Sequence, residues 1–303
     1  IKPRQLICDA HPAYASSRWA RQQGQDCHEV LHHHAHASAL AGEFPHESHW
    51  LVFAWDGTGY GEDKTLWGGE SFYGQPGQWQ RIASQRPFKL PGGDRVSHEP
   101  WRAALALCWE TGQTCTLEEK HHALLYKAWQ QDLNNPVSSA IGRLFDAAAA
   151  LTCICQQASF EGQAPMLLEA MARQSGSSDY LELPFIKQHG LWRSDWSVLL
   201  PMLMDVSITQ ADRAACFHHS LARQLLQQCL CFKEHYDDFA VGLVGGVFQN
   251  RLLSELSIDL IKQAGFRVYL PAQLPCNDGG LSFGQVIEFA AKQTSKARLC
   301  EER

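Results

Sequence analysis

The stretch that decides the fold class is "DFAVGLVGGVFQNRLLSELSIDLIKQAGFRVYL", residues 238–270. It opens with apolar β-forming residues, turns at Gly245 and Gly246, continues with a helical pattern from about Arg251, and closes with a second short β-forming run. A strand, a helix and a second strand in this order form a βαβ unit. The sequence therefore predicts an α/β fold.

The flanking segments extend this prediction in both directions. Residues 49–61, "HWLVFAWDGTGYG", predict a strand that ends in a glycine-rich turn, and residues 65–74 and 78–88 continue it as an antiparallel meander. A helix is expected from about Glu99, and residues 140–231 are expected to be mostly helical. A second glycine turn, "NDGG", precedes a helix near the end of the chain.

Charge and composition exclude two kinds of partner. The 303-residue chain has a formal net charge of −6 and no basic block, so no nucleic-acid partner is expected. No apolar run approaches the roughly 20 residues that cross a bilayer, so no membrane partner is expected. Eleven cysteines are scattered along the chain. We interpret them, including the Cys153/Cys155 and Cys229/Cys231 pairs in apparently helical segments, as buried free thiols of a cytoplasmic protein.

A histidine-rich segment, "HEVLHHHAHASALAGEF" at residues 28–44, indicates a metal site. His32 and His36 are four residues apart, so on a helix their rings project from the same face and can share one ion. A solvated polar face is the alternative. Because His33 stands where HExxH metalloproteases have their glutamate, we do not expect that enzyme class.

Two aspartates in glycine turns supply further candidate ligands. Asp56 in "WDGTGYG" and Asp278 in "NDGG" could hold a cation beside a phosphate that the glycine backbone cradles. An ordinary Asp-Gly turn is the alternative for each of them. Together with His32 and His36, these carboxylates would form a site for Fe(II) or Zn(II).

Eight stretches of the chain resemble the C-terminal domain of HypF, the carbamoyltransferase family of nickel–iron hydrogenase maturation. In chain order they are "CDAHPAYASSRWA", "HHHAHASA", "DGTGYGEDKTLWGGE", "LPGGDRVSHEPWR", "IGRLFDAAAAL", "FEGQAPMLLEA", "GGVFQNRLL" and "NDGGLSFGQ". The resemblance implies two ribonuclease-H-like lobes of the actin, sugar-kinase and heat-shock-chaperone (ASKHA) superfamily, with nucleotide and metal between them. We place the lobes at residues 1–135 and 136–303.

The resemblance also implies a role for each matching position. The metal ligands would be His32, His36, Asp56 and Asp278. The residues that hold ATP or carbamoyl-adenylate would be Gly57, Thr58, Gly245 and Gly246 at the phosphates, and Asp146, Gly162 and Asn250 at the ribose and base. His33 and His34 are candidate catalytic residues that would deprotonate the acceptor or hold the carbamoyl group; a supporting position outside the reaction is the alternative.

The reaction implied by the resemblance is a carbamoyl transfer. A YrdC-like domain would make carbamoyl-adenylate from carbamoyl phosphate and ATP, and this chain would pass the carbamoyl group to the C-terminal cysteine of HypE, toward the cyanide ligand of the hydrogenase. Two alternatives stay open. One is an O-carbamoyltransferase that acts on a small hydroxylated acceptor, and the other is an inactive nucleotide- and metal-binding module that docks HypE.

Overall fold

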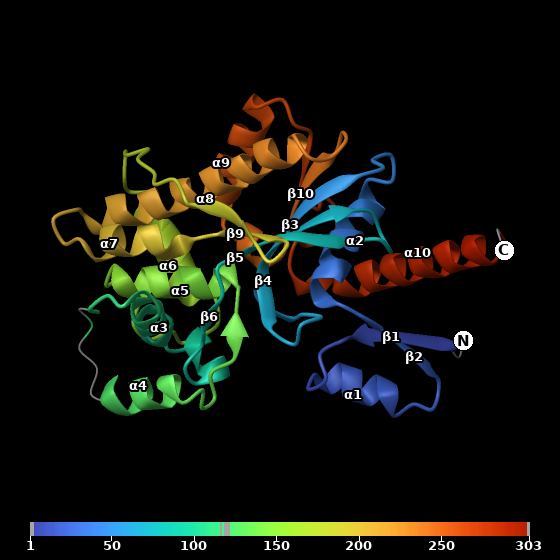
Figure 1. Ribbon diagram of the computed structural model, residues 1–303, viewed down its shortest axis with the longest axis horizontal. Helices are drawn as coiled ribbons and strands as arrows, with labels where there is room; N and C mark the ends of the chain where they lie inside the picture. The colour runs from blue at the N-terminus through green and yellow to red at the C-terminus, as the bar shows by residue number, and fades with distance from the viewer. Residues whose placement is uncertain (1–2, 116, 118–121, 302–303) are drawn as a thin grey trace.

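A central nine-stranded sheet organises the chain in the computed structural model, which describes residues 3–115, 117 and 122–301 (Figure 1). Its main path has the order β11-β10-β3-β4-β5-β9-β8. Off this path β7 pairs with β4 and β6 pairs with β7, while β1 and β2 form a separate parallel pair. The strands are β1 (Gln5–Asp9), β2 (Asp26–Val30), β3 (Trp50–Tyr60), β4 (Leu66–Gly74), β5 (Gln80–Gln85), β6 (Phe88–Lys89), β7 (Val137–Ser138), β8 (Phe185–Gln188), β9 (Leu191–Ser194), β10 (Ala240–Val244) and β11 (Val268–Tyr269).

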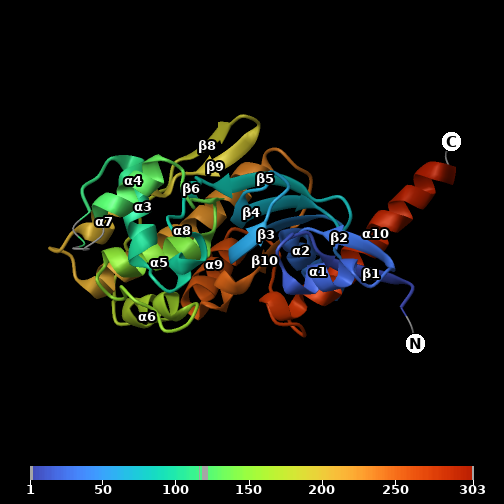
Figure 2. The same ribbon diagram turned by 90° about the horizontal axis from the view of Figure 1, so that it is seen from below.

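Helices cover both faces of this sheet (Figures 1 and 2). The α-helices are α1 (Ala15–Arg21), α2 (His32–Glu43), α3 (Trp101–Thr111), α4 (His122–Gln130), α5 (Ile141–Leu151), α6 (Gln163–Ala172), α7 (Leu199–Met204), α8 (Gln210–Lys233), α9 (Arg251–Gln263) and α10 (Leu281–Glu301). Four short 3-10 helices are η1 (Gly93–Ser97), η2 (Trp196–Val198), η3 (Gly246–Gln249) and η4 (Asp278–Gly280). The helix predicted from about Glu99 is confirmed as α3.

The predicted βαβ unit is confirmed by β10, α9 and β11. β10 pairs in parallel with β11 on one side and with β3 on the other, where Ala240 faces Trp50 and Val244 faces Ala54. This register places the carboxyl end of β10 beside Ala54, midway along β3. Asp56, just beyond this paired stretch of β3, is therefore brought next to the Gly245 turn.

Strand β3 is buried on both faces, and its side chains alternate between two hydrophobic cores. Leu51, Phe53 and Trp55 join the larger core, to which helices α3, α5, α6, α8 and α9 also contribute. Trp50, Val52 and Ala54 face the smaller core with α2. α10 packs on α2 so closely that a Cβ atom on Gly284 would lie 1.9 Å from the carbonyl oxygen of Ala35.

The prediction that residues 140–231 are mostly helical is wrong for one segment. β8 and β9 form an antiparallel hairpin there, and β9 extends the sheet by pairing in parallel with β5. The two turn residues have φ values of 50° at His189 and 84° at Gly190, as a tight hairpin requires. A His-Gly turn between two short strands lacks the Asn-Gly or Asp-Gly signal that would have revealed it.

The sheet does not divide at the predicted lobe boundary between residues 135 and 136. It includes β3, β4 and β5 from the first segment and β8 to β11 from the second, and β10 pairs directly with β3. The placement of the lobes at residues 1–135 and 136–303 stays a prediction.

The cysteines of the described part of the chain are free thiols, as predicted. The prediction of burial is wrong for Cys153, which is exposed, and for Cys27, Cys115, Cys231 and Cys276, which are only partly buried. Cys153 and Cys155 also lie beyond the end of α5 instead of in a helix. Cys153 has a φ of 59°, which ends the helix there. Within the described residues, no helix combines the length and apolar character that crossing a bilayer demands.

Candidate functional site

Four side chains from distant parts of the chain converge at one point. His32 and His36 lie on the first turns of α2, Asp56 lies in β3, and Asp278 opens η4. One ligand atom from each lies within 4.8 Å of all the others. Nε2 of His36 is 3.1 Å from Oδ2 of Asp56 and 3.4 Å from Oδ1 of Asp278, and Nε2 of His32 is 3.4 Å from both of those oxygens. The structure thus brings together all four predicted metal ligands.

The electrostatics of this cluster fit a divalent cation. Burial alone would lower the pKa of His32, but hydrogen bonds to Asp278, Asp56 and Asp9 raise it well above its usual value. Burial would likewise raise the pKa of Asp56, but the two imidazoles hold it well below its usual range. Nε2 of His36 is buried and, despite its nearness to Asp56, makes no hydrogen bond. Two imidazole nitrogens and two carboxylate oxygens are donors that Fe(II) and Zn(II) accept.

A fifth residue, Asp9, supports the cluster and was missed from the sequence. Its Oδ2 lies 3.0 Å from Nδ1 of His32, and its Oδ1 accepts a 2.7 Å hydrogen bond from the backbone N–H of His11. A carboxylate on one ring nitrogen fixes the tautomer and leaves the other nitrogen free as a ligand. Asp9 ends β1 in "CDAHP", and an aspartate a few residues before a proline indicates only a turn.

The two predicted glycine turns lie against the carboxylate of Asp56, but the first is not a true turn. β3 continues through Asp56 and Gly57 to Tyr60, with a register shift in its pairing to β4 between Trp55 and Gly59, and the Gly57 turn means this irregular segment of the strand. Gly245 has a φ of 98°, and a Cβ atom there would lie 2.2 Å from the carbonyl oxygen of Trp55, so only glycine fits. A Cβ atom on Gly246 would lie 3.0 Å from Oδ1 of Asp56. The Gly57 N–H donates to Oδ1 of Asp56, and the Gly245 N–H donates to the carbonyl oxygen of Cys276. Gly246 begins η3, and an N–H at the start of a helix has no acceptor within that helix.

A buried charged group adjoins the Gly57 turn on the α5 side. Arg143 Nη1 lies 3.1 Å from Oδ2 of Asp146, and its Nη2 lies 3.3 Å from Oε1 of Glu161. Burial raises the pKa of Asp146 to about 6, although Arg143 opposes the shift. Asp146, predicted to hold the ribose and base, is therefore paired with Arg143, which adjoins the Gly57 turn. This arginine was not predicted from the sequence.

The remaining residues that were predicted to bind nucleotide differ in their exposure and in their hydrogen bonds. Thr58 is exposed beside the Gly57 turn, and Gly162 starts α6 with a φ of 87°. Asn250 is buried, caps α9 by accepting from the Leu253 N–H, and donates to Nε2 of His218. Its amide thus positions the helix that follows the second glycine turn. Whether these residues contact nucleotide stays a prediction.

His33 and His34, the predicted catalytic candidates, lie outside the four-residue cluster. His33 is fully buried, and neither of its ring nitrogens has a hydrogen-bond partner; burial lowers its pKa well below the usual value. His34 packs edge-on against Phe72 and lies 3.8 Å from Glu288 of α10, and burial lowers its pKa to about 4. A catalytic role for either stays a prediction.

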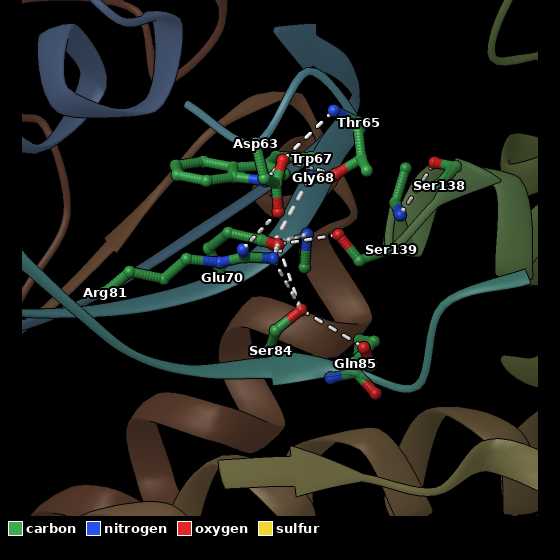
Figure 3. Close-up of polar contacts among 12 residues, drawn as sticks. Asp63, Thr65, Trp67, Gly68, Glu70, Arg81, Ser84, Gln85, Ser138 and Ser139 are labelled. Atoms are coloured by element: carbon green, nitrogen blue, oxygen red, sulfur yellow. Dashed lines mark hydrogen bonds and ion pairs between the residues drawn. The ribbon is translucent and has the colours of Figure 1, made fainter. Parts of the chain in front are cut away.

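A buried carboxylate network fixes the hairpin that follows the Asp56 loop (Figure 3). Glu70 on β4 is fully buried and accepts hydrogen bonds from Arg81, Ser84, Ser139 and the Gly69 N–H, at 2.6–3.0 Å. Ser139 lies two residues before the start of α5. The network therefore ties the hairpin of the first glycine turn to the helix that carries Arg143 and Asp146.

Comparison with known families places the chain in one of them. A model described as the second subdomain of the carbamoyltransferase Kae1-like domain matches residues 52–285, and a model described as the HypF Kae1-like domain matches residues 1–43. The chain belongs to the HypF carbamoyltransferase family. The resemblance in the sequence is thereby confirmed.

Individual HypF relatives agree with this membership. The chain is 34% identical to the carbamoyltransferase HypF of Synechocystis sp., covering 99% of this chain and 41% of that relative. It is 31% identical to a HypF homolog of Cupriavidus necator, covering 95% of this chain and 78% of that relative. It thus spans about 40% of the length of most HypF proteins it matches.

Solved HypF structures confirm the fold class. The full-length HypF in its phosphate- and nucleotide-bound form matches with a TM-score of 0.89 at 28% identity, over 97% of this chain and 39% of that one. The structure of T. kodakarensis HypF matches with a TM-score of 0.83 at 24% identity, over 96% of this chain and 41% of that one. The mixed α/β fold predicted from the sequence is that of the HypF Kae1-like domain, consistent with the ASKHA superfamily.

Proposed function

We propose that this chain transfers a carbamoyl group from carbamoyl-adenylate to the C-terminal cysteine thiol of HypE. The observation that carries the proposal is the convergence of His32, His36, Asp56 and Asp278 beside two glycine turns. A YrdC-like domain, in the same or another chain, would supply the adenylate from carbamoyl phosphate and ATP. Membership of the carbamoyltransferase family supports the reaction class.

In the proposed reaction the chain binds and orients both substrates. The phosphate of the adenylate lies against Gly57 and Gly246, and Asp146 lies where the ribose would follow. The thiolate sulfur attacks the carbamoyl carbon, the bond from this carbon to the phosphate oxygen breaks, and AMP leaves with the electron pair. Fe(II) or Zn(II) held by the four ligands would supply electrophilic assistance by neutralising charge on the phosphate.

The acceptor supplies the nucleophile, so no thiol of this chain is needed. Cys276 and Cys8 would be poor nucleophiles. Burial raises the pKa of Cys276, and burial together with the neighbouring thiol of Cys27 raises the pKa of Cys8 to about 11. A raised pKa leaves little thiolate at neutral pH.

The decisive experiment combines the chain, a separate YrdC-like domain, carbamoyl phosphate, ATP and HypE. We expect the C-terminal peptide of HypE to gain the mass of one carbamoyl group, and His36→Ala to abolish the gain while leaving the fold intact by circular dichroism. HypE without its terminal cysteine is the matched acceptor control. Carbamoylation of free hydroxyl compounds instead of HypE would favour an O-carbamoyltransferase, and binding of HypE without any transfer would favour a docking module.

A further inference from the structure

A guanidinium group lies directly against the first glycine turn. Arg143 is the third residue of α5, and only 7% of its surface is exposed. A Cβ atom on Gly57 would lie 3.1 Å from its Nη2. The helix itself approaches the turn closely, because a Cβ atom on Gly142 would lie 2.7 Å from Cα of Gly57. A group bound against this side of Gly57 would therefore meet this arginine.

The hydrogen-bonding capacity of Arg143 is not fully used. Its Nε is buried and has no hydrogen-bond partner. Both carboxylate oxygens of Asp146 also lack hydrogen bonds, although one of them is 3.1 Å from Nη1. A buried donor of this kind normally has a partner, which here would come from a ligand.

Two carboxylates compete for the single positive charge of Arg143, and they are held very differently. Asp146 is fully buried on the same helix, one turn away. The side chain of Glu161 is 64% exposed and precedes α6, so it regains hydration as soon as it leaves the guanidinium. Glu161 is therefore the partner that a competing anion can replace.

We propose that Arg143 binds the phosphate group of the nucleotide and that Glu161 occupies its guanidinium until the phosphate displaces it. This inference rests on the proposed function, which puts an adenylate against the Gly57 turn. Arginine suits the role because its planar donors match phosphate oxygens in a two-point contact. Asp146 keeps the guanidinium oriented during the exchange.

Opposite effects of two neutral substitutions test the proposal. Isothermal titration calorimetry measures the affinities for ADP and for adenosine. Arg143→Gln should weaken ADP binding about tenfold to a hundredfold, the usual effect of losing a hydrogen bond to a charged group, and leave adenosine binding unchanged. Glu161→Gln should strengthen ADP binding by up to about fivefold, as expected for releasing a partly exposed ion pair. In the double variant, the gain from Glu161→Gln should disappear.

Matched variants separate phosphate binding from a structural role. Asp238→Asn removes a carboxylate that pairs with Arg267 at 2.9 Å and should leave ADP affinity unchanged. If Arg143→Gln fails to fold by circular dichroism, Arg143→Lys and Glu161→Gln carry the test, and Arg143→Lys should keep part of the preference for ADP over adenosine.

Two results would overturn the proposal while leaving the proposed function intact. One is equal weakening of ADP and adenosine binding in the arginine variants, and the other is a loss of ADP affinity in Glu161→Gln. Absence of any adenine-nucleotide binding by the wild type would overturn both this proposal and the proposed function.

Discussion

Replacing Asp9 with alanine should lower the affinity of the cluster for Zn(II) while leaving all four ligands in place. The Asp9 carboxylate is 5% exposed, lies 3.0 Å from Nδ1 of His32, and is itself held by the His11 N–H. A hydrogen bond with a charged partner contributes about 1.5–3 kcal/mol, which corresponds to an affinity change of about tenfold to 150-fold. Removing a carboxylate that orients a metal-bound imidazole typically costs about tenfold to a hundredfold.

The assay is a titration of metal-free protein with Zn(II) in competition with a chromophoric chelator. Asp9→Asn retains an acceptor oxygen and should fall between the wild type and Asp9→Ala. Asp26→Asn, an exposed aspartate on the adjacent strand β2, is the control. An Asp9→Ala affinity within about twofold of the wild type would refute the reasoning, since it would mean that His32 keeps its orientation and basicity without the carboxylate.

Three other substitutions test the remaining parts of the site. His36→Ala should purify with little bound metal, measured by elemental analysis, whereas His46→Ala, at an exposed histidine beyond α2, should keep the wild-type metal content. Gly245→Ala should lower the free energy of unfolding in urea by about 2 kcal/mol or more, because φ is 98° and a Cβ would meet Trp55; Gly176→Ala, with open space around it, should change it little. Burial lowers the pKa of His218 to about 4 from its ordinary value of 6.5, so between those pH values the unfolded chain takes up a proton that the folded chain does not. The free energy of unfolding should therefore fall by up to about 3 kcal/mol more in the wild type than in His218→Gln as the pH drops through this window, and parallel pH profiles would contradict the assignment.

The local parts of the fold were predictable because their signals are periodic and short in range. Apolar residues at helical spacing predicted α9, and the i,i+4 pair His32 and His36 predicted one shared helix face on α2. The glycines of residues 245–246 and the β-forming runs around them predicted the βαβ unit. In each case, residues close in sequence decide the geometry.

The long-range parts of the site needed the family resemblance or the structure. Nothing local places Asp278 beside His36, because their approach depends on β10 pairing with β3 and on the chain returning past β11. Asp9 was missed since its partner, His32, lies on another element, and Arg143 was missed since a single arginine in a helix usually lies at the surface. The 185–194 hairpin was missed because its turn residues are atypical.

The unequal exposure of the four cluster side chains has a kinetic consequence. The side chains of His32, His36 and Asp56 are 1%, 3% and 14% exposed, but that of Asp278 is 67% exposed. An incoming ion would shed its last water molecules on the Asp278 side, and a chelator would attack from there as well. Asp278 would thus be the most accessible ligand of the proposed metal site, and its replacement should speed dissociation of the ion more than it slows capture.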